Sequence, residues 1–260
     1  MRYVGGKRRQ SKFLIPLIES NDNGQTYVEP FCGSLAVGGN LRWSGNLILS
    51  DKHEYLIRSW QYFYEHRPQY NYDFTVEQYN IMHKNKFNSN DWRIGLYKFG
   101  LSFAGVYTGT LACHKRGIKE ISHRDVELIH EYANKVCNNL DNLNFKFSCC
   151  DYCELDIPDG SFVYADPPYV AGNKRNQYGL GKFDHKEFWE WARNIAKRCQ
   201  LIVTEFEAPE DFKPIFSFGN TSVQQRGNNG IEKGVSSTID QSKQERIWTY
   251  KYGLPVKSLW

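Results

Sequence analysis

The alternation of apolar and polar positions near the N-terminus predicts the start of an α/β sheet. Short apolar runs at 26–30 and 47–50 predict two strands, joined by a glycine turn at 31–34 and a short helix over 35–37. An amphipathic helix over 7–20 precedes them. A strand, a glycine turn, a helix and a strand that ends on an acid are typical of an open parallel α/β sheet, which binds ligands at the carboxyl ends of its strands.

The middle of the chain has a different pattern. From Tyr55 to Tyr107 it is crowded with aromatic residues, and its periodicity is helical more than strand-like. A further amphipathic helix is predicted over 124–140. We therefore expect a separate, mostly helical lobe at this point.

The strand pattern resumes at 145–150 and 162–165, and each run is followed at once by an acid, Asp151 or Asp166. The other elements predicted here are a helix and two strands, at 183–199, 201–204 and 246–250. Residues 219–244 are polar and rich in Gly, Ser and Asn, which predicts a long mobile hairpin loop.

These elements predict one α/β core that is interrupted by an insertion. The core, of Rossmann-like type, is expected to comprise residues 1–56 and 145–260. The inserted helical lobe is expected over 57–144. A chain of 260 residues is long enough for a core of ordinary size that carries such a lobe.

Composition limits the class of protein. The chain is 40% hydrophobic and 24% charged, and no apolar run approaches the about 20 residues that cross a bilayer. We expect no membrane association, no signal peptide and a cytoplasmic location. Seven cysteines are an odd count over a long chain, which indicates reduced thiols and no structural disulfide.

Basic residues gather in runs, although the net charge is only +4. Any one run is more simply a solvated face, but three runs beside candidate sites favour contacts with phosphate groups. The candidates for such contacts are Arg8, Arg9, Lys115, Arg116, Lys174 and Arg175.

The sharpest chemical signal is Asp166-Pro167-Pro168-Tyr169, directly after a predicted strand. Consecutive prolines stiffen the loop and keep its carbonyls aimed. The Asp166 carboxylate and the Pro167 carbonyl can accept both hydrogens of an aromatic amino group and localise its lone pair, and the Tyr169 ring can stack on an extruded base. The alternative is a structural proline turn.

Two further segments indicate a cofactor site. In Glu29-Pro30-Phe31-Cys32-Gly33-Ser34 a glycine turn lets a cofactor approach the backbone, and Asp51 ends the next strand, where ribose hydroxyls can bind. The segment lacks the phosphate-binding glycine runs of NAD and ATP sites. Asp151 is positioned to bind an adenine amino group. The alternative for the glycine segment is a structural turn.

The N-terminal Tyr3-Val4-Gly5-Gly6-Lys7 can place an aromatic face and an ammonium against the cofactor, with Lys7 pairing a carboxylate. Its alternative is a frayed basic tail. Cys150 and Cys153 form a C-x-x-C without a second pair, so we expect reduced thiols and no metal site.

In order, spacing and content these motifs resemble the Dam-like class of adenine-N6 DNA methyltransferases, particularly phage-encoded members, some of which serve restriction-modification. The resemblance implies S-adenosylmethionine as cofactor, with contacts from the three segments and the strand-end acids. The implied cofactor residues are Tyr3, Gly6, Lys7, Phe31, Cys32, Gly33, Ser34, Asp51, Asp151 and Asp166; the implied catalytic residues are Asp166, Pro167, Pro168 and Tyr169. It also implies that residues 102–107 belong to a DNA-reading lobe.

The chain departs from the family pattern at three places. Tyr3 stands where a tryptophan is common, Leu35 occupies the last glycine position of the cofactor loop, and residues 204–206 match the late motif only loosely. The resulting expectation is transfer of a methyl group to N6 of a flipped adenine in double-stranded DNA, by a monomer or weak dimer. The alternatives are a methyltransferase acting on RNA or protein and a catalytically silent DNA-binding protein.

Overall fold

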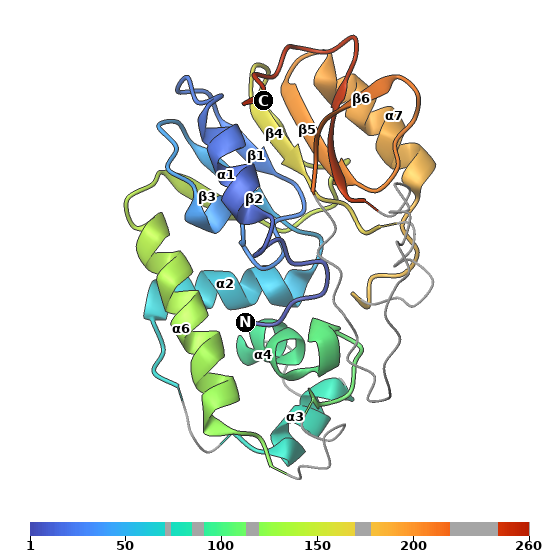
Figure 1. The fold of residues 1–260 in the computed structure, drawn as a ribbon. Helices are drawn as coiled ribbons and strands as arrows, with labels where there is room; N and C mark the ends of the chain where they lie inside the picture. The colour runs from blue at the N-terminus through green and yellow to red at the C-terminus, as the bar shows by residue number, and fades with distance from the viewer. Residues whose placement is uncertain (71–73, 85–90, 113–119, 170–177, 219–243, 260) are drawn as a thin grey trace, which may run out of the picture.

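A computed structural model describes residues 1–70, 74–84, 91–112, 120–169, 178–218 and 244–259. Within these residues, strands form a seven-stranded sheet in the order β3-β2-β1-β4-β5-β7-β6, in the upper half of the molecule in Figure 1. The strands are β1 Tyr27–Glu29, β2 Leu47–Ser50, β3 Phe145–Ser148, β4 Phe162–Ala165, β5 Gln200–Glu205, β6 Phe212–Ser217 and β7 Arg246–Tyr250. The α/β class and the Rossmann-like core are confirmed.

The sheet is mixed, whereas the sequence predicts a parallel one. The five strands β3-β2-β1-β4-β5 are parallel, but β7 is antiparallel to both β5 and β6. Antiparallel strands need no crossover helix, so β7 can return directly beside β6. The strand β6 was not predicted, because its exposed Lys213 and its Pro214 interrupt the apolar pattern.

Both faces of the sheet are buried. Along β2, Leu47 and Leu49 join a core with α1 (Ser11–Glu19), while Ile48 points to the opposite core with α7 (His185–Ala196). Such alternation follows from the two-residue period of a strand. The continuous apolar runs at 47–50 and 162–165 therefore reflect strands that are covered on both sides.

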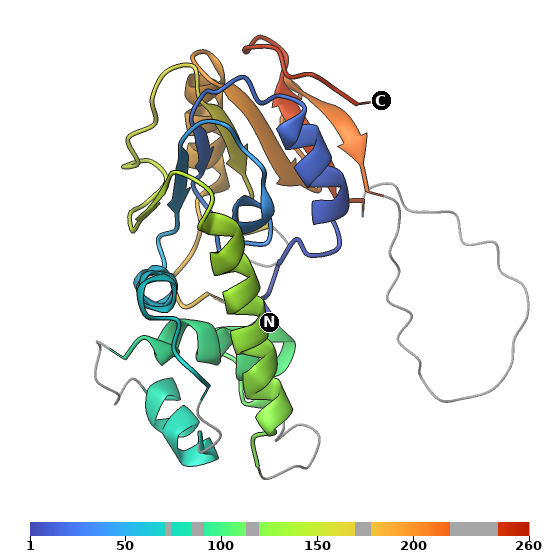
Figure 2. The same ribbon diagram turned by 90° about the vertical axis from the view of Figure 1, so that its left-hand side faces the viewer.

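Helices make up most of the described chain between β2 and β3. They are α2 Glu54–His66, α3 Val76–His83, α4 Arg93–Leu101 and α6 His123–Leu140, with a short 3-10 turn, η2, at Phe103–Gly105. In Figures 1 and 2 they lie beyond one end of the sheet, and α6 runs from the sheet to the far end of this helical layer. None of the helices in the described part of the chain is long and apolar enough to span a bilayer.

The prediction of a helix over residues 35–37 is wrong. The segment forms turns, followed by the short 3-10 helix η1 at Gly38–Asn40. Gly33 and Leu35 have φ angles of 46° and 57°, in the left-handed region, so the chain cannot continue as a right-handed helix there. The carboxylate of Glu29 accepts a hydrogen bond from the Gly38 N–H at 2.8 Å and holds the loop in this path.

Other predicted boundaries differ by a few residues. The strands predicted at 47–50, 162–165 and 246–250 coincide with β2, β4 and β7. The helices predicted over 7–20 and 183–199 are shorter, as α1 and α7. Residues 219–243 of the loop that was predicted to be mobile lie outside the described residues.

Candidate active site

One pocket lies where the order of strands reverses. The chain runs from β1 outward to β2 and β3, then returns to place β4 on the other side of β1. In parallel α/β sheets, ligands bind outside the carboxyl ends of the strands at such a point. Here the segments that follow β1, β2, β3 and β4 line the pocket together with residues 3–7.

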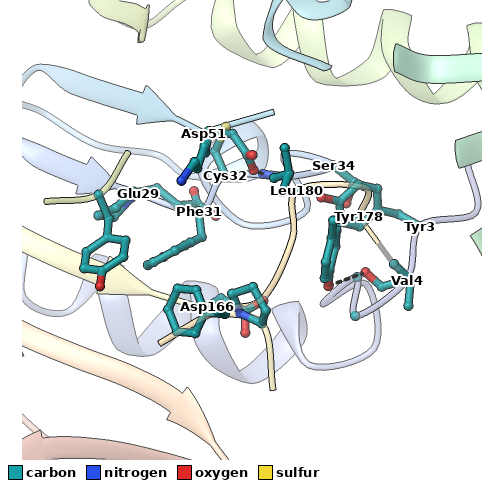
Figure 3. A pocket seen from close by; sticks show the side chains of 18 of the residues that line it. Tyr3, Val4, Glu29, Phe31, Cys32, Ser34, Asp51, Asp166, Tyr178 and Leu180 are labelled. Atoms are coloured by element: carbon teal, nitrogen blue, oxygen red, sulfur yellow. Dashed lines mark hydrogen bonds between the residues drawn. The ribbon is translucent and has the colours of Figure 1, made fainter. Parts of the chain in front are cut away.

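The structure brings the predicted cofactor residues together. Residues from five separate segments of the sequence line this one pocket: Tyr3, Gly6, Lys7, Phe31, Cys32, Gly33, Ser34, Asp51, Asp151 and Asp166. Figure 3 shows Tyr3, Phe31, Asp51 and Asp166 around it. Pro168 and Tyr169 line it as well, while Pro167 is buried and does not. Their roles toward a cofactor or substrate remain predictions.

Asp51 ties the glycine turn to the start of α2. One carboxylate oxygen accepts the Gly33 N–H and the other accepts the His53 N–H, both at 2.9 Å. Burial raises the pKa of Asp51 to about 6, although both hydrogen bonds act in the opposite direction. Each oxygen retains a second lone pair, so this carboxylate can still accept hydroxyl donors from the pocket.

The N-terminal segment is a fixed wall of the pocket, so the alternative of a frayed tail is wrong. The Val4 N–H donates to the Gly105 carbonyl at 2.9 Å, and the Tyr178 hydroxyl donates to the Val4 carbonyl at 3.2 Å (Figure 3). The Tyr3 ring lies so close to Gly33 that a Cβ atom there would be 2.9 Å from it. Only glycine fits beneath that ring.

Lys7 is a buried ammonium at the centre of a polar cluster. Its side chain is 4% exposed, and its Nζ atom forms an ion pair with Asp166 at 2.6 Å. The same atom donates to the Gly5 carbonyl at 3.1 Å and to the Tyr169 hydroxyl, and lies 3.3 Å from Glu245. The predicted lysine–carboxylate pair is therefore formed within the protein itself.

Asp166 ends β4 and is held from two sides. Besides Lys7, its carboxylate accepts the Thr204 hydroxyl at 2.7 Å. Burial raises the pKa of Asp166, and the nearby Glu245 raises it further, whereas Lys7 and Thr204 lower it. We call Lys7, Asp166, Tyr169, Thr204 and Glu245 the charged cluster.

Tyr169 is fixed at both its hydroxyl and its ring. The hydroxyl donates to Glu245 at 2.5 Å, and the ring meets Phe206 edge-on at 5.0 Å between centroids. The Lys7 ammonium lies 4.6 Å from the centroid of the Tyr169 ring. The orientation of this ring is thus set by groups from several segments of the chain.

An aromatic cluster forms another wall of the pocket. Phe31 packs against Tyr152 and Phe183, with centroid separations of 5.3 and 5.9 Å. Near it, Asp151 pairs with the exposed Lys52 at 2.6 Å. Burial would raise the pKa of Asp151, but hydrogen bonds from Lys52 and Cys153 outweigh it, so the pKa is lowered.

Sequence reasoning did not identify Glu245, and it gave no individual role to Glu29 or Thr204, although both lie in segments that it named. Glu29 is buried, accepts the Tyr27 hydroxyl at 3.1 Å, and has its pKa raised by burial to about 8. Its position at the end of β1, like that of Asp51 on β2, could have identified it. Ala165 pairs with Val203 in the sheet, so the next residues, Asp166 and Thr204, are neighbours once β5 is placed beside β4.

The predicted DNA-contacting residues are only partly described. Arg8 and Arg9 are exposed, and the Arg8 guanidinium lies 5.4 Å from the Tyr132 ring centroid. The other four, Lys115, Arg116, Lys174 and Arg175, lie outside the described residues. Cys153 is exposed and Cys150 partly so, both are free thiols, and no cluster of metal-binding side chains occurs in the described ranges.

The first part of the chain matches a family of methyltransferases. Residues 3–92 match the family model of the D12 class N6 adenine-specific DNA methyltransferases. The match contains Tyr3, Lys7, the segment 29–34 and Asp51, and confirms the family resemblance predicted from the motifs. Asp166-Pro167-Pro168-Tyr169 lies beyond the matched residues.

Solved structures similar to this chain include the rRNA methyltransferase aviRa from Streptomyces viridochromogenes. It is 12% identical, with a TM-score of 0.37, over 94% of this chain and 84% of that one. TrmN from Thermus thermophilus is 10% identical, with a TM-score of 0.37, over 93% of this chain and 48% of that one. No curated protein sequence matches the chain.

Proposed function

We propose that this methyltransferase transfers a methyl group from S-adenosylmethionine to N6 of an adenine flipped out of double-stranded DNA. One observation carries the proposal: the carboxylate of Asp166, only 16% exposed and followed by two prolines and a tyrosine, lies in the same pocket as the strand-end acids and the glycine turn. A carboxylate in that position can accept an amino hydrogen of the base while a methyl donor occupies the rest of the pocket.

The chemistry of the pocket suits S-adenosylmethionine. Asp51 offers carboxylate oxygens to ribose hydroxyls, and Asp151 offers one to an adenine amino group. Phe31 and its aromatic neighbours provide flat apolar surface for an adenine ring, and Tyr3 provides ring surface for a cation. When bound, the cofactor supplies an electrophilic methyl group on a sulfonium.

The departure at Leu35 is compatible with this cofactor. Leu35 takes the left-handed conformation that glycine would adopt at the same place, with φ of 57°. Its side chain is fully buried in the core around α1 and is not among the residues that line the pocket. The substitution therefore strains the backbone without filling the site.

Asp166 would prepare the amino group for attack. An ionised carboxylate that accepts one N6 hydrogen, with a backbone carbonyl accepting the other, draws the nitrogen toward tetrahedral geometry. The N6 lone pair would then be free to take up the methyl group as its bond to sulfur breaks, with the neutral thioether S-adenosylhomocysteine as the leaving group, and the methylated nitrogen would release a proton to water. Tyr169 would hold the flipped base by stacking, and Arg8 and Arg9 would contact phosphates. The helices between β2 and β3 would read the target.

A labelled-methyl assay on unmethylated duplex DNA, single-stranded RNA and protein tests the proposal. We expect N6-methyladenine after digestion to nucleosides, and a loss of about 10³-fold in kcat for Asp166→Asn. Asp159→Asn is the matched control, because Asp159 is 79% exposed and precedes β4 at its other end. Methylation confined to cytosine, to RNA or to protein would reject the adenine assignment.

A further inference from the structure

Glu245 enters the site from a distant part of the chain. It precedes β7, and its backbone carbonyl accepts the Phe218 N–H at 2.9 Å. The next residue, Arg246, pairs with Ser217 in the β6–β7 ladder. The sheet therefore fixes the backbone from which this carboxylate extends.

The Glu245 carboxylate joins two segments of the charged cluster. One oxygen, Oε1, accepts the Tyr169 hydroxyl at 2.5 Å and lies 3.3 Å from Lys7 Nζ. The other, Oε2, accepts the side-chain amide of Gln10 at 2.9 Å. The side chain is only 11% exposed, so these contacts are made largely out of water.

Lys7 consequently lies between two carboxylates. In the structure it is closer to Asp166, at 2.6 Å, than to Glu245, at 3.3 Å. An adenine amino group that binds Asp166 would compete with Lys7 for the charge of the same carboxylate. A buried ammonium that lost its only counter-ion would be strongly destabilised, so a second carboxylate beside it lowers the cost of that exchange.

We propose that Glu245 is a positioning residue for methyl transfer, which fixes the Tyr169 hydroxyl and holds Lys7 when Asp166 turns to the substrate amino group. This inference rests on the proposed function. Glu245 touches neither the base nor the cofactor; it acts through Tyr169 and Lys7. Two consequences follow: its charge contributes to the transfer step, and its hydrogen bond sets the orientation of the Tyr169 ring.

Steady-state kinetics of the full chain separate these roles. Glu245→Gln preserves the shape of the side chain but removes its charge, and should lower kcat about tenfold with the KM for S-adenosylmethionine unchanged within about twofold. Glu245→Ala should lower kcat further. The matched control is Glu190→Gln on an exposed position of α7, which should behave as wild type.

A double-variant cycle tests the route through Tyr169. Tyr169→Phe keeps the ring and removes the hydroxyl, so adding it to Glu245→Ala should cost less than about twofold more in kcat. If the two substitutions lowered kcat by factors that multiply in the double variant, Glu245 and Tyr169 would not act through their shared hydrogen bond. Wild-type kcat in both Glu245 variants, or an effect on KM alone, would overturn the proposal.

The readouts also separate this inference from the proposed function. If the wild type methylates a different acceptor, the adenine assignment fails, but the ratio of kcat between Glu190→Gln and Glu245→Gln on that acceptor still decides the role of Glu245. A crystal structure of Glu245→Ala needs no acceptor. We expect the Tyr169 hydroxyl to leave its place, and an unmoved ring and an unmoved Lys7 would refute the positioning role.

Discussion

Two ion pairs of the pocket have the same N–O separation but opposite surroundings. Lys7–Asp166 and Lys52–Asp151 are both 2.6 Å long. The Lys7 side chain is 4% exposed, whereas that of Lys52 is 58% exposed. Since water screens the outer pair and not the inner one, equal geometry gives unequal energy. Burial, rather than distance, decides which charges the protein depends on.

The inner pair should dominate the effect on stability. Lys7→Met leaves Asp166 and Glu245 buried without their shared cation, and we expect the free energy of unfolding at pH 7 to fall by about 3–5 kcal/mol. Urea denaturation measures it. Removal of Lys7 also raises the pKa of Asp166 further, because Lys7 is the largest influence that lowers it. A loss below about 1 kcal/mol would show that the inner pair resembles an exposed one.

Glu29 offers a second contrast, because it is a buried acid that forms no ion pair with any residue in the described part of the chain. The pKa of Glu29 is raised to about 8, so the fold favours its protonated form. That contribution to stability is complete below the ordinary pKa of 4.5 and is lost as the pH rises to about 8. Relative to wild type, the free energy of unfolding of Glu29→Gln should therefore rise by about 3–4 kcal/mol between pH 5 and pH 8. If the difference in the free energy of unfolding between the two proteins did not change with pH, the raised pKa of Glu29 would be contradicted.

Three acids of the site could be predicted from the sequence and Glu245 could not, and the reason is physical. Asp51, Asp151 and Asp166 each follow a local apolar run, and that local pattern is enough to place them at the edge of a parallel sheet. Glu245 lies 76 positions from Tyr169, so only the pairing of β7 with β5 brings it to the site. Contacts that depend on strand order leave no signal in a local window.

The predicted helix at 35–37 failed for a related reason. Its residues favour a helix locally, but the Tyr3 ring above Gly33 and the carboxylate of Glu29 at Gly38 hold the segment in a tight turn. Contacts from the N-terminal segment and from the end of β1 override a three-residue preference.

The buried Asp51 extends the comparison from protein stability to the binding of S-adenosylmethionine. We expect Asp51→Asn to weaken S-adenosylmethionine binding about tenfold, since hydrogen bonds to a charged acceptor are the stronger ones. With its pKa raised to about 6, wild-type affinity should increase as the pH rises through that value. Calorimetric titration from pH 5 to pH 8 measures both, and the variant should show no such rise. Equal pH dependence in the two proteins would exclude Asp51 as the acceptor.

The outer pair should have the smallest effect. Lys52→Met removes a screened partner of Asp151, and we expect the free energy of unfolding to change by less than about 1 kcal/mol. It is the matched control for Lys7→Met, and the same denaturation experiment measures it. A loss as large as that of Lys7→Met would contradict the role given to burial.

A crystal structure with bound S-adenosylmethionine would test the proposed arrangement of the pocket. We expect the sulfonium methyl to point toward the Asp166 carboxylate, the ribose hydroxyls to contact Asp51, and the adenine ring to pack against Phe31 beside Asp151. A bound cofactor whose methyl group faces away from Asp166 would contradict this arrangement.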